Sequence, residues 1–198
     1  MILALGRSSK EHSQGSGFFI APGIIVTNRH VVDKGSKLIV IMPDKTEVTA
    51  KLVGKSTTID AAVLKVDRTN HSSLRFARSS SVQIGSQVCA VGYPVSDYLA
   101  AASGTADFSK ALAGISPTST YGRIGGRQTL KNTKCLHLDL NLNPGNSGGP
   151  VMDRASQVVG VSTYKLMGAD GTVQGMNFAI EADLVRQFVE ETVPGIRL

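Results

Sequence analysis

Short apolar runs separated by turn residues recur along most of the chain. Some alternate hydrophobic and polar side chains, the spacing of a strand that buries one face, and others are continuous apolar runs of strand length. Clusters of glycine, proline and asparagine stand between them, as in connections between short strands. These runs predict strands at residues 17–20, 24–27, 37–42, 47–53, 61–66, 87–91, 134–140, 157–163 and 176–180. We therefore predict an all-β fold, a sandwich or a barrel.

Three segments depart from the strand pattern. Residues 181–191, "EADLVRQFVEE", space apolar side chains along one side of a helix, with Asp183 as the expected N-cap. Residues 95–116 are rich in Ala, Ser and Gly and have no period, so we expect a long loop or an insertion. The polar stretch at residues 78–81 divides the strands into two groups. We predict one domain over residues 1–198, with an N-terminal lobe at 1–77 and a C-terminal lobe, including the helix, at 82–198.

The composition fits a globular, water-soluble chain. At 198 residues and 41% hydrophobic, the chain can bury the core of a two-lobed domain. Its longest apolar stretch, residues 18–26, is broken by Pro22 and Gly23 and is far shorter than the ~20 residues that cross a bilayer. The apolar run Ile2 to Leu5 is too short for a secretory signal, so we expect none in this chain. The compartment, bacterial periplasm or cytoplasm, stays open.

The net charge of +6 does not by itself indicate a nucleic-acid partner. Most Lys and Arg residues are scattered along the chain, and the one loose basic group has no interleaved aromatic residues on which bases could stack. That group consists of Arg123, Arg127, Lys131 and Lys134. We therefore do not expect nucleic-acid binding, and a homo-oligomer stays open.

Neither cysteine is expected to take part in chemistry. Cys89 and Cys135 lie in apolar, strand-like runs without CxxC spacing, which predicts free buried thiols rather than a disulfide. The histidines lack ligand spacing with cysteines or acids, so we expect no metal and no cofactor.

Three residues could form a nucleophilic site. A serine hydroxyl is a weak nucleophile that needs a neutral imidazole to take its proton and a carboxylate to orient that imidazole. Ser147 lies in the turn "LNPGNSGGP", and His30 follows an apolar strand in "IIVTNRHVVD". Asp60 directly precedes another apolar strand, where a buried carboxylate requires a partner. Each motif alone has a structural alternative: a glycine-rich turn, a packed histidine or a solvated acid.

The glycines around Ser147 favour the catalytic interpretation. Gly145 can adopt backbone angles closed to other residues, so that its N–H and that of Ser147 converge on one spot. Two such donors form a hole for the oxyanion of an acyl-transfer reaction. Asn146, between them, is expected to shape the turn through its backbone.

The order of the motifs resembles that of trypsin-like serine proteases. The matching stretches are "GSGFFIAPGIIVTNRHVV", "DAAVLKVD", "VGYP", "NPGNSGGPV" and "VVGVST...GMNFAI". Together they extend over residues 15–190 and most resemble the protease domain of the HtrA/Deg group. That group usually carries PDZ modules after this domain, and none is recognised in this sequence.

The resemblance implies a chymotrypsin-like fold of two six-stranded antiparallel β-barrels with a short C-terminal helix. It implies His30 as general base, Asp60 as its orienting carboxylate and Ser147 as nucleophile, with Gly145, Asn146 and Ser147 forming the oxyanion hole. The base of the primary specificity pocket falls at Asn141. The remaining pocket residues are expected to be Leu142, Val161, Ser162, Thr163 and Phe178.

We thus expect a serine endopeptidase that cuts unfolded or flexible polypeptides through an acyl-enzyme. Because no acid stands at Asn141, a Lys or Arg side chain would be buried unpaired, and cleavage is expected after small or medium apolar residues. Two alternatives stay open: a catalytically latent, chaperone-like or protein-binding module on the same fold, and an esterase or viral-type processing enzyme.

Overall fold

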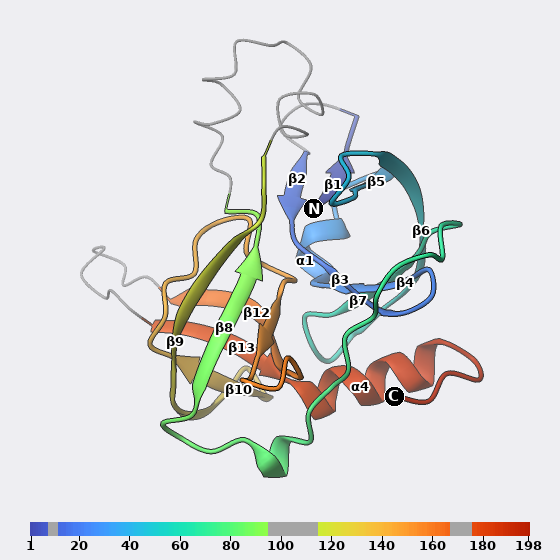
Figure 1. Ribbon diagram of the computed structural model, residues 1–198. Helices are drawn as coiled ribbons and strands as arrows, with labels where there is room; N and C mark the ends of the chain where they lie inside the picture. Colours follow the sequence, from blue (N-terminus) through green and yellow to red (C-terminus); the bar gives the residue numbers. More distant parts are fainter. Residues whose placement is uncertain (8–11, 95–114, 167–175) are drawn as a thin grey trace.

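The structure, a computed structural model, describes residues 1–7, 12–94, 115–166 and 176–198. It forms two β lobes side by side, with a helix beneath them (Figure 1). All nine strands predicted from the sequence are present, with ends that differ by a few residues. The all-β prediction is thus confirmed, whereas most of the loop predicted at 95–116 lies outside the described residues.

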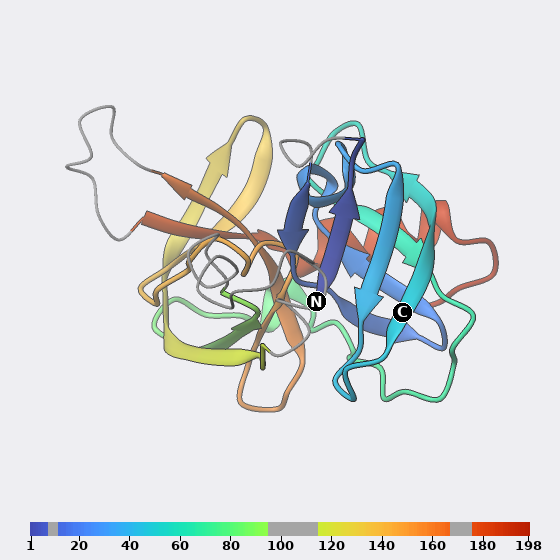
Figure 2. The same cartoon turned by 90° about the horizontal axis from the view of Figure 1, so that it is seen from above.

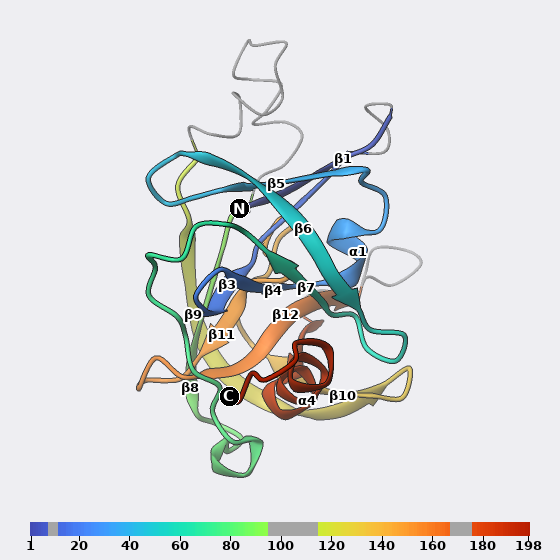
Figure 3. The ribbon, with the colours of Figure 1, turned by 90° about the vertical axis from the view of Figure 1, so that its right-hand side faces the viewer.

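The first lobe is one strongly curled antiparallel sheet (Figure 2). Its strand order is β2-β1-β5-β6-β7-β4-β3, and the short helix α1 (Arg29–Val32) follows β4. The strands are β1 (Ile2–Leu5), β2 (Ser13–Gly15), β3 (Phe18–Ala21), β4 (Ile24–Thr27), β5 (Lys37–Ile41), β6 (Glu47–Lys55) and β7 (Ala62–Lys65). Viewed from the side, the long strand β6 crosses the lobe next to β5 (Figure 3).

This lobe differs in detail from a closed six-stranded barrel, because its sheet has seven strands and two edges. The two edge strands, β2 and β3, are consecutive in the chain and are separated only by Ser16 and Gly17. One bent segment therefore contributes both edges. The ladder is interrupted at Ser16 because its N–H donates to Ser147 of the second lobe, at 2.8 Å, instead of to a neighbouring strand.

The second lobe is a closed six-stranded barrel, as expected, in the order β10-β13-β12-β11-β8-β9. The linker enters it through a one-turn 3-10 helix, η2 (Ser79–Ser81). The barrel strands are β8 (Gln87–Gly92), β9 (Thr118–Leu130), β10 (Thr133–Leu138), β11 (Pro150–Met152), β12 (Val158–Leu166) and β13 (Met176–Glu181). Ser147 lies in the loop that leads from β10 into β11.

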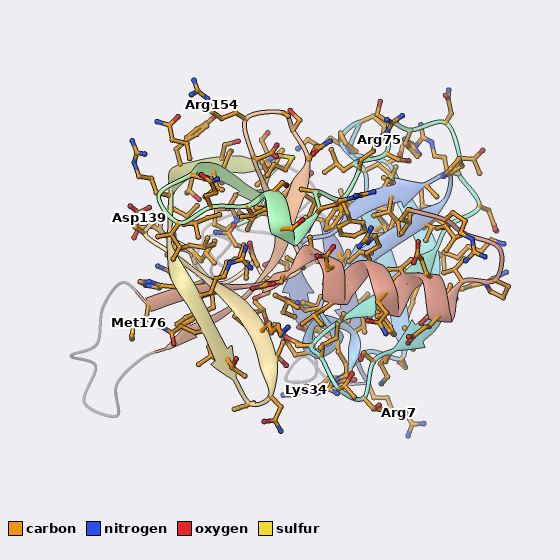
Figure 4. The ribbon with its side chains drawn as sticks, turned by 90° about the horizontal axis from the view of Figure 1, so that it is seen from below. Arg7, Lys34, Arg75, Asp139, Arg154 and Met176 are labelled. Atoms are coloured by element: carbon orange, nitrogen blue, oxygen red, sulfur yellow. The ribbon has the colours of Figure 1, made fainter. Side chains whose placement is uncertain are left out.

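The terminal helix α4 (Ala182–Thr192) packs against both lobes rather than against the barrel alone (Figure 4). Val185 and Val189 are fully buried in a cluster with Phe18 of the first lobe and Val161 of the second. Burying an aliphatic side chain of this size contributes about 1.5 to 3 kcal/mol. The N-cap is Glu181, not Asp183, whose carboxylate instead accepts a hydrogen bond from Arg186 at 2.7 Å.

Four strands carry no pattern that predicted them. β9 is the clearest case, because its sequence "TSTYGRIGGRQTL" buries only Ile124. A strand that exposes most of its side chains lacks the alternation that signals a half-buried strand. β1, β2 and β11 have only three or four residues each, too few for a period to be recognised.

Candidate active site

His30 and Asp60 form the best-defined contact of the site. Asn28 stands at the N-cap position of the short helix α1 without a side-chain capping bond, and His30 lies in the first turn of α1 with 48% of its side chain exposed. The His30 ring nitrogen Nδ1 lies 2.6 Å from Asp60 Oδ2, and the His30 backbone N–H donates to Asp60 Oδ1 at 2.9 Å. A carboxylate only accepts, so Nδ1 carries the proton and Nε2 is left as an acceptor.

Asp60 is buried, with 5% of its side chain exposed, and both of its carboxylate oxygens accept hydrogen bonds from protein groups. The Thr163 hydroxyl donates to the same Oδ2 at 2.8 Å, and Asn28 Nδ2 donates to the Asp60 backbone carbonyl at 2.7 Å. Burial raises the pKa of the Asp60 carboxyl, but the hydrogen bonds and charge of His30 and the bond from Thr163 outweigh it, so the pKa lies below its ordinary 3.8. The carboxylate therefore stays ionised at neutral pH.

The chain around Gly145 forms a type II turn. The Asn146 N–H donates to the Asn143 carbonyl at 3.0 Å, and Gly145 has φ +95°. The ring of Pro144 fixes a negative φ before this glycine, which matches type II and excludes the mirror-image type I′. In a type I turn the Pro144–Gly145 peptide would be rotated, with the Gly145 N–H facing the other way.

Two backbone donors of this turn are free. Within the described ranges, neither the Gly145 N–H nor the Ser147 N–H has a hydrogen-bond acceptor. The neighbouring N–H groups are all occupied, because Asn146 donates to Asn143, Gly148 to Ser162 and Gly149 to Asn146. Two unpaired donors one residue apart, beside the candidate nucleophile, are what an oxyanion hole requires.

The Ser147 hydroxyl contacts Thr163. Its Oγ donates to the Thr163 carbonyl at 3.4 Å, a long and weak hydrogen bond. In the part of the chain that the structure describes, no hydrogen bond joins Ser147 to His30. Thr163 therefore links the two halves of the site: its hydroxyl binds Asp60 and its carbonyl binds Ser147.

The residues expected to line a specificity pocket do not all share one surface. Leu142 is buried in the barrel interior with Ala179, and Ser162 pairs with Ala179, so Leu142 and Ser162 face the same way. Val161 points to the opposite side, into the cluster under α4, and the ring of Phe178 lies against His137 at a centroid distance of 5.4 Å. Asn141 is exposed and Thr163 binds Asp60.

The remaining expectations concern cysteines, metals and charge. Cys89 is half-buried, Cys135 is buried, and both thiols are free as predicted. Across the described residues, no three His, Cys, Asp or Glu side chains are grouped so that they could hold a metal ion. The labelled basic residues Arg75 and Arg154 lie apart from Arg7 and Lys34 on the surface (Figure 4).

No helix among the described residues is long and apolar enough to cross a membrane.

Residues 15–161 match the family model of the trypsin-like peptidase domain. The chain belongs to the trypsin-like peptidase family. The match contains His30, Asp60, Gly145 and Ser147 and ends at Val161 in β12. It confirms the resemblance stated from the motifs.

Curated relatives place this peptidase domain close to DegP-like proteins. A probable periplasmic serine endoprotease of Rhizobium meliloti, described as DegP-like, is 37% identical over 190 residues, 93% of this chain and 34% of its own length. A protein of the same description from Bartonella henselae is 38% identical over 185 residues, 90% of this chain and 33% of its own. The chain thus spans about a third of the length of these relatives.

Solved structures with the same fold are HtrA-type proteases. The protease AlgW with a tripeptide has a TM-score of 0.79 and 28% identity, over 98% of this chain and 59% of that one. The serine endoprotease of Yersinia pestis has a TM-score of 0.75 and 27% identity, over 98% and 62%. These similarities agree with the chymotrypsin-like architecture expected from the sequence.

Sequence reasoning missed Ser16 and Asn28 and assigned Thr163 to the pocket instead of to Asp60. Both missed residues are buried polar side chains in the first lobe. A signal for each was present, because Asn28 directly precedes the helix that carries His30, and Ser16 stands between two glycines directly before the first predicted strand. Neither signal reveals which atoms they bind.

Proposed function

We propose that the protein is a serine endopeptidase with His30, Asp60 and Ser147 as its catalytic triad. The observation that carries the proposal is the chain of hydrogen bonds through Thr163, which joins the Asp60–His30 pair to Ser147. It brings together, from both lobes, the three residues selected independently from the sequence. Membership of the trypsin-like peptidase family supports the same chemistry.

The geometry suggests how each residue acts. The Asp60 carboxylate keeps the proton of His30 on Nδ1, so that Nε2 can take the proton of the Ser147 hydroxyl. Because the bond from Ser147 to the Thr163 carbonyl is weak, rotation of the hydroxyl towards His30 costs little. Ser147 then adds to the peptide carbonyl, His30 returns the proton to the leaving amine, and water releases the acyl group by the same route.

The free donors of the turn complete the proposal. The N–H groups of Gly145 and Ser147 would stabilise the negative oxygen of each tetrahedral intermediate. Asn146 contributes through its backbone, which closes one turn with Asn143 and accepts from Gly149 in the next.

A fluorophosphonate probe tests the proposal, because it reacts only with a serine that is activated by a base. We expect the native protein to bind one equivalent, and peptide mapping by mass spectrometry to place the label on Ser147. Protein unfolded in urea should stay unlabelled, since the base is then no longer held in place. Absence of labelling in a folded, monodisperse sample would contradict the proposal.

The alternative is a latent, chaperone-like or protein-binding module with a flipped oxyanion turn. The positive φ of Gly145 and the free N–H groups favour the active enzyme, because the flipped turn would be type I. A casein assay with protein that has not been treated with the probe separates the enzyme from the latent module. The enzyme should hydrolyse casein, whereas a latent module would prevent aggregation without cleaving.

We further propose that cleavage follows small or medium apolar residues, such as Val, Ala or Leu. Asn141 carries no charge to pair with Lys or Arg. The apolar side chain of Leu142 and the small hydroxyl of Ser162 face the same side of the second lobe's sheet. In a peptide library we expect kcat/KM at least about tenfold higher after Val than after Arg. Efficient cleavage after Arg would refute this pocket assignment.

The substrate class and the oligomeric state are further proposals. We propose unfolded or flexible polypeptide segments as substrates, because an extended substrate backbone can pair with a strand near the site, such as that at residues 161–163. The relatives are about three times longer than this chain, and a homo-oligomer stays an open proposal.

A further inference from the structure

Ser16 is buried at the junction of the two lobes, and all of its polar groups are used. Its side chain and backbone are only 1% exposed. Its N–H donates to the Ser147 carbonyl at 2.8 Å, and its hydroxyl donates to the Gly145 carbonyl at 2.7 Å. The hydroxyl also accepts from the Tyr93 N–H at 2.9 Å, and the Ser16 carbonyl accepts from the Thr27 hydroxyl at 2.7 Å.

Two of these bonds hold the carbonyls of the residues that carry the free N–H groups. The Gly145 carbonyl belongs to the Gly145–Asn146 peptide, which lies between the two free N–H groups, so the orientation of this peptide sets how the N–H groups of Gly145 and Ser147 converge. A carbonyl bonded at 2.7 Å to a buried hydroxyl resists rotation of its peptide, because an unpaired buried acceptor is costly. The Ser147 carbonyl is fixed in the same way from the other end.

From this network we infer that Ser16 is a positioning residue of the oxyanion hole. Its hydroxyl holds the Gly145–Asn146 peptide in the orientation in which the unpaired N–H groups of Gly145 and Ser147 converge. The inference rests on the proposed serine endopeptidase function. It explains why the first lobe interrupts its sheet at Ser16, since the backbone there binds the turn of the second lobe instead of a neighbouring strand.

The surrounding packing allows the Ser16 side chain little movement. A Cβ placed on Gly92 would lie 3.0 Å from Ser16 Oγ and 2.5 Å from Asn146 Oδ1. A Cβ on Gly149 would lie 3.3 Å from Ser16 Cβ. The hydroxyl thus lies between the end of β8 and the oxyanion turn. The hydrogen bond that it accepts from the Tyr93 N–H fixes its position relative to the end of β8.

Thr27 provides a matched control. Its hydroxyl makes a hydrogen bond of the same length, 2.7 Å, to a carbonyl of the same buried network, but that carbonyl belongs to Ser16 and not to the turn. Replacing Thr27 by the isosteric valine removes one buried hydrogen bond without releasing Gly145. Ser16→Ala removes the bond that holds Gly145 and, with it, the acceptor of the Tyr93 N–H.

The experiment compares Ser16→Ala, Thr27→Val and the wild-type chain by steady-state kinetics on a peptide amide and by inhibition with a peptide aldehyde. The aldehyde adds Ser147 Oγ to its carbonyl, and the resulting hemiacetal oxygen occupies the oxyanion hole. If the Gly145–Asn146 peptide is no longer held in Ser16→Ala, the two N–H groups converge in only a small share of the molecules, and kcat falls by that share, about 10- to 100-fold. KM should stay within about threefold, and aldehyde inhibition should weaken by the same factor as kcat.

Thr27→Val should keep kcat within about threefold while it loses thermal stability, though less than Ser16→Ala, because it breaks one buried hydrogen bond instead of two. Ser16→Cys, with a weaker donor, should give a kcat between those of the wild type and Ser16→Ala, and it carries the test if the alanine variant does not fold. Equal kcat in Ser16→Ala and Thr27→Val would overturn the inference, because the serine would then be merely structural. A wild-type chain that neither hydrolyses peptides nor reacts with the aldehyde would instead overturn the proposed function and this inference with it.

Discussion

Ser147→Ala is expected to lower kcat for casein or a peptide amide by about 10⁴- to 10⁶-fold, because it removes the only atom that the proposed mechanism lets form the acyl-enzyme. Some rate above that of water should remain, since the free N–H groups of Gly145 and Ser147 still bind the oxyanion. The Ser147 hydroxyl makes only a 3.4 Å bond in the structure, so its loss should leave the melting temperature close to that of the wild type. Initial rates and a thermal melt measure both quantities.

Ser36→Ala is the control for this substitution. Ser36 is exposed in the first lobe, and its hydroxyl donates to the Leu5 carbonyl at 3.2 Å and not to any residue of the site. Its activity should equal that of the wild type. Undiminished hydrolysis by purified Ser147→Ala protein would show that Ser147 is not the nucleophile, and the assignment of the whole turn would fail with it.

Asp60→Asn is expected to lower kcat by about 10⁴-fold, the size of the effect when a triad aspartate becomes an amide in other serine proteases. In this site Asp60 Oδ2 accepts from both His30 Nδ1 and the Thr163 hydroxyl, and Oδ1 accepts from the His30 N–H. An amide has one accepting oxygen, so one of these positions must hold an NH₂ group. If the NH₂ faces His30 Nδ1, the ring proton moves to Nε2 and the base cannot accept a proton from Ser147.

Asp33→Asn is the matched control for the loss of one carboxylate near His30. Asp33 ends the same short helix and pairs with Arg29 and Lys55, but it is about 41% exposed and does not contact His30. Exposed ion pairs contribute about 0 to 1 kcal/mol, so this variant should keep its activity. A comparable loss of kcat in both variants would indicate a general charge effect and would contradict the assigned role of Asp60.

A comparison of the wild type with Asp60→Asn also tests the pKa of Asp60. Because its folded-state pKa lies below the ordinary 3.8, the ionised carboxylate stabilises the fold at pH values above 3.8, and this contribution is lost as the pH falls through the lowered pKa. The wild-type free energy of unfolding should therefore decline more steeply with acid than that of Asp60→Asn as the pH falls from about 5 through the lowered pKa of Asp60. Urea denaturation across this range measures it, and parallel curves would contradict the lowered pKa.

The local patterns of the sequence were sufficient for most of the architecture. Most of the nine strands were visible because each buries a face or a run of apolar side chains, and burial imposes a period on neighbouring residues. β6 was visible from its alternating Val48, Ala50 and Leu52, although only Ala50 of these is buried. The candidate triad was visible because the residues next to His30, Asp60 and Ser147 form recognisable turns and strand starts. The type II turn was encoded by Pro144 and Gly145, whose backbone preferences are intrinsic to these two residue types.

Other features had no local trace. β9 exposes almost its whole length and joins the barrel only through its two neighbours, so its sequence has no period to reveal it. The seven-strand count of the first lobe follows from a bend at Ser16 that is set by a bond to the second lobe. Helix α4 was predicted from its apolar face, but only the folded chain shows that this face is shared between both lobes.

The sequence alone thus determined the all-β class, the positions of most strands and the candidate residues His30, Asp60 and Ser147, because each depends on residues a few positions apart. Only the tertiary structure decided that Thr163 binds Asp60, that Val161 and Leu142 face different clusters, and that Ser16 holds Gly145. These contacts join residues that are far apart in the chain, 129 positions in the case of Ser16 and Gly145. A hydrogen bond over such a separation imposes no pattern on the residues beside either partner, and it exists only once the two lobes have folded against each other.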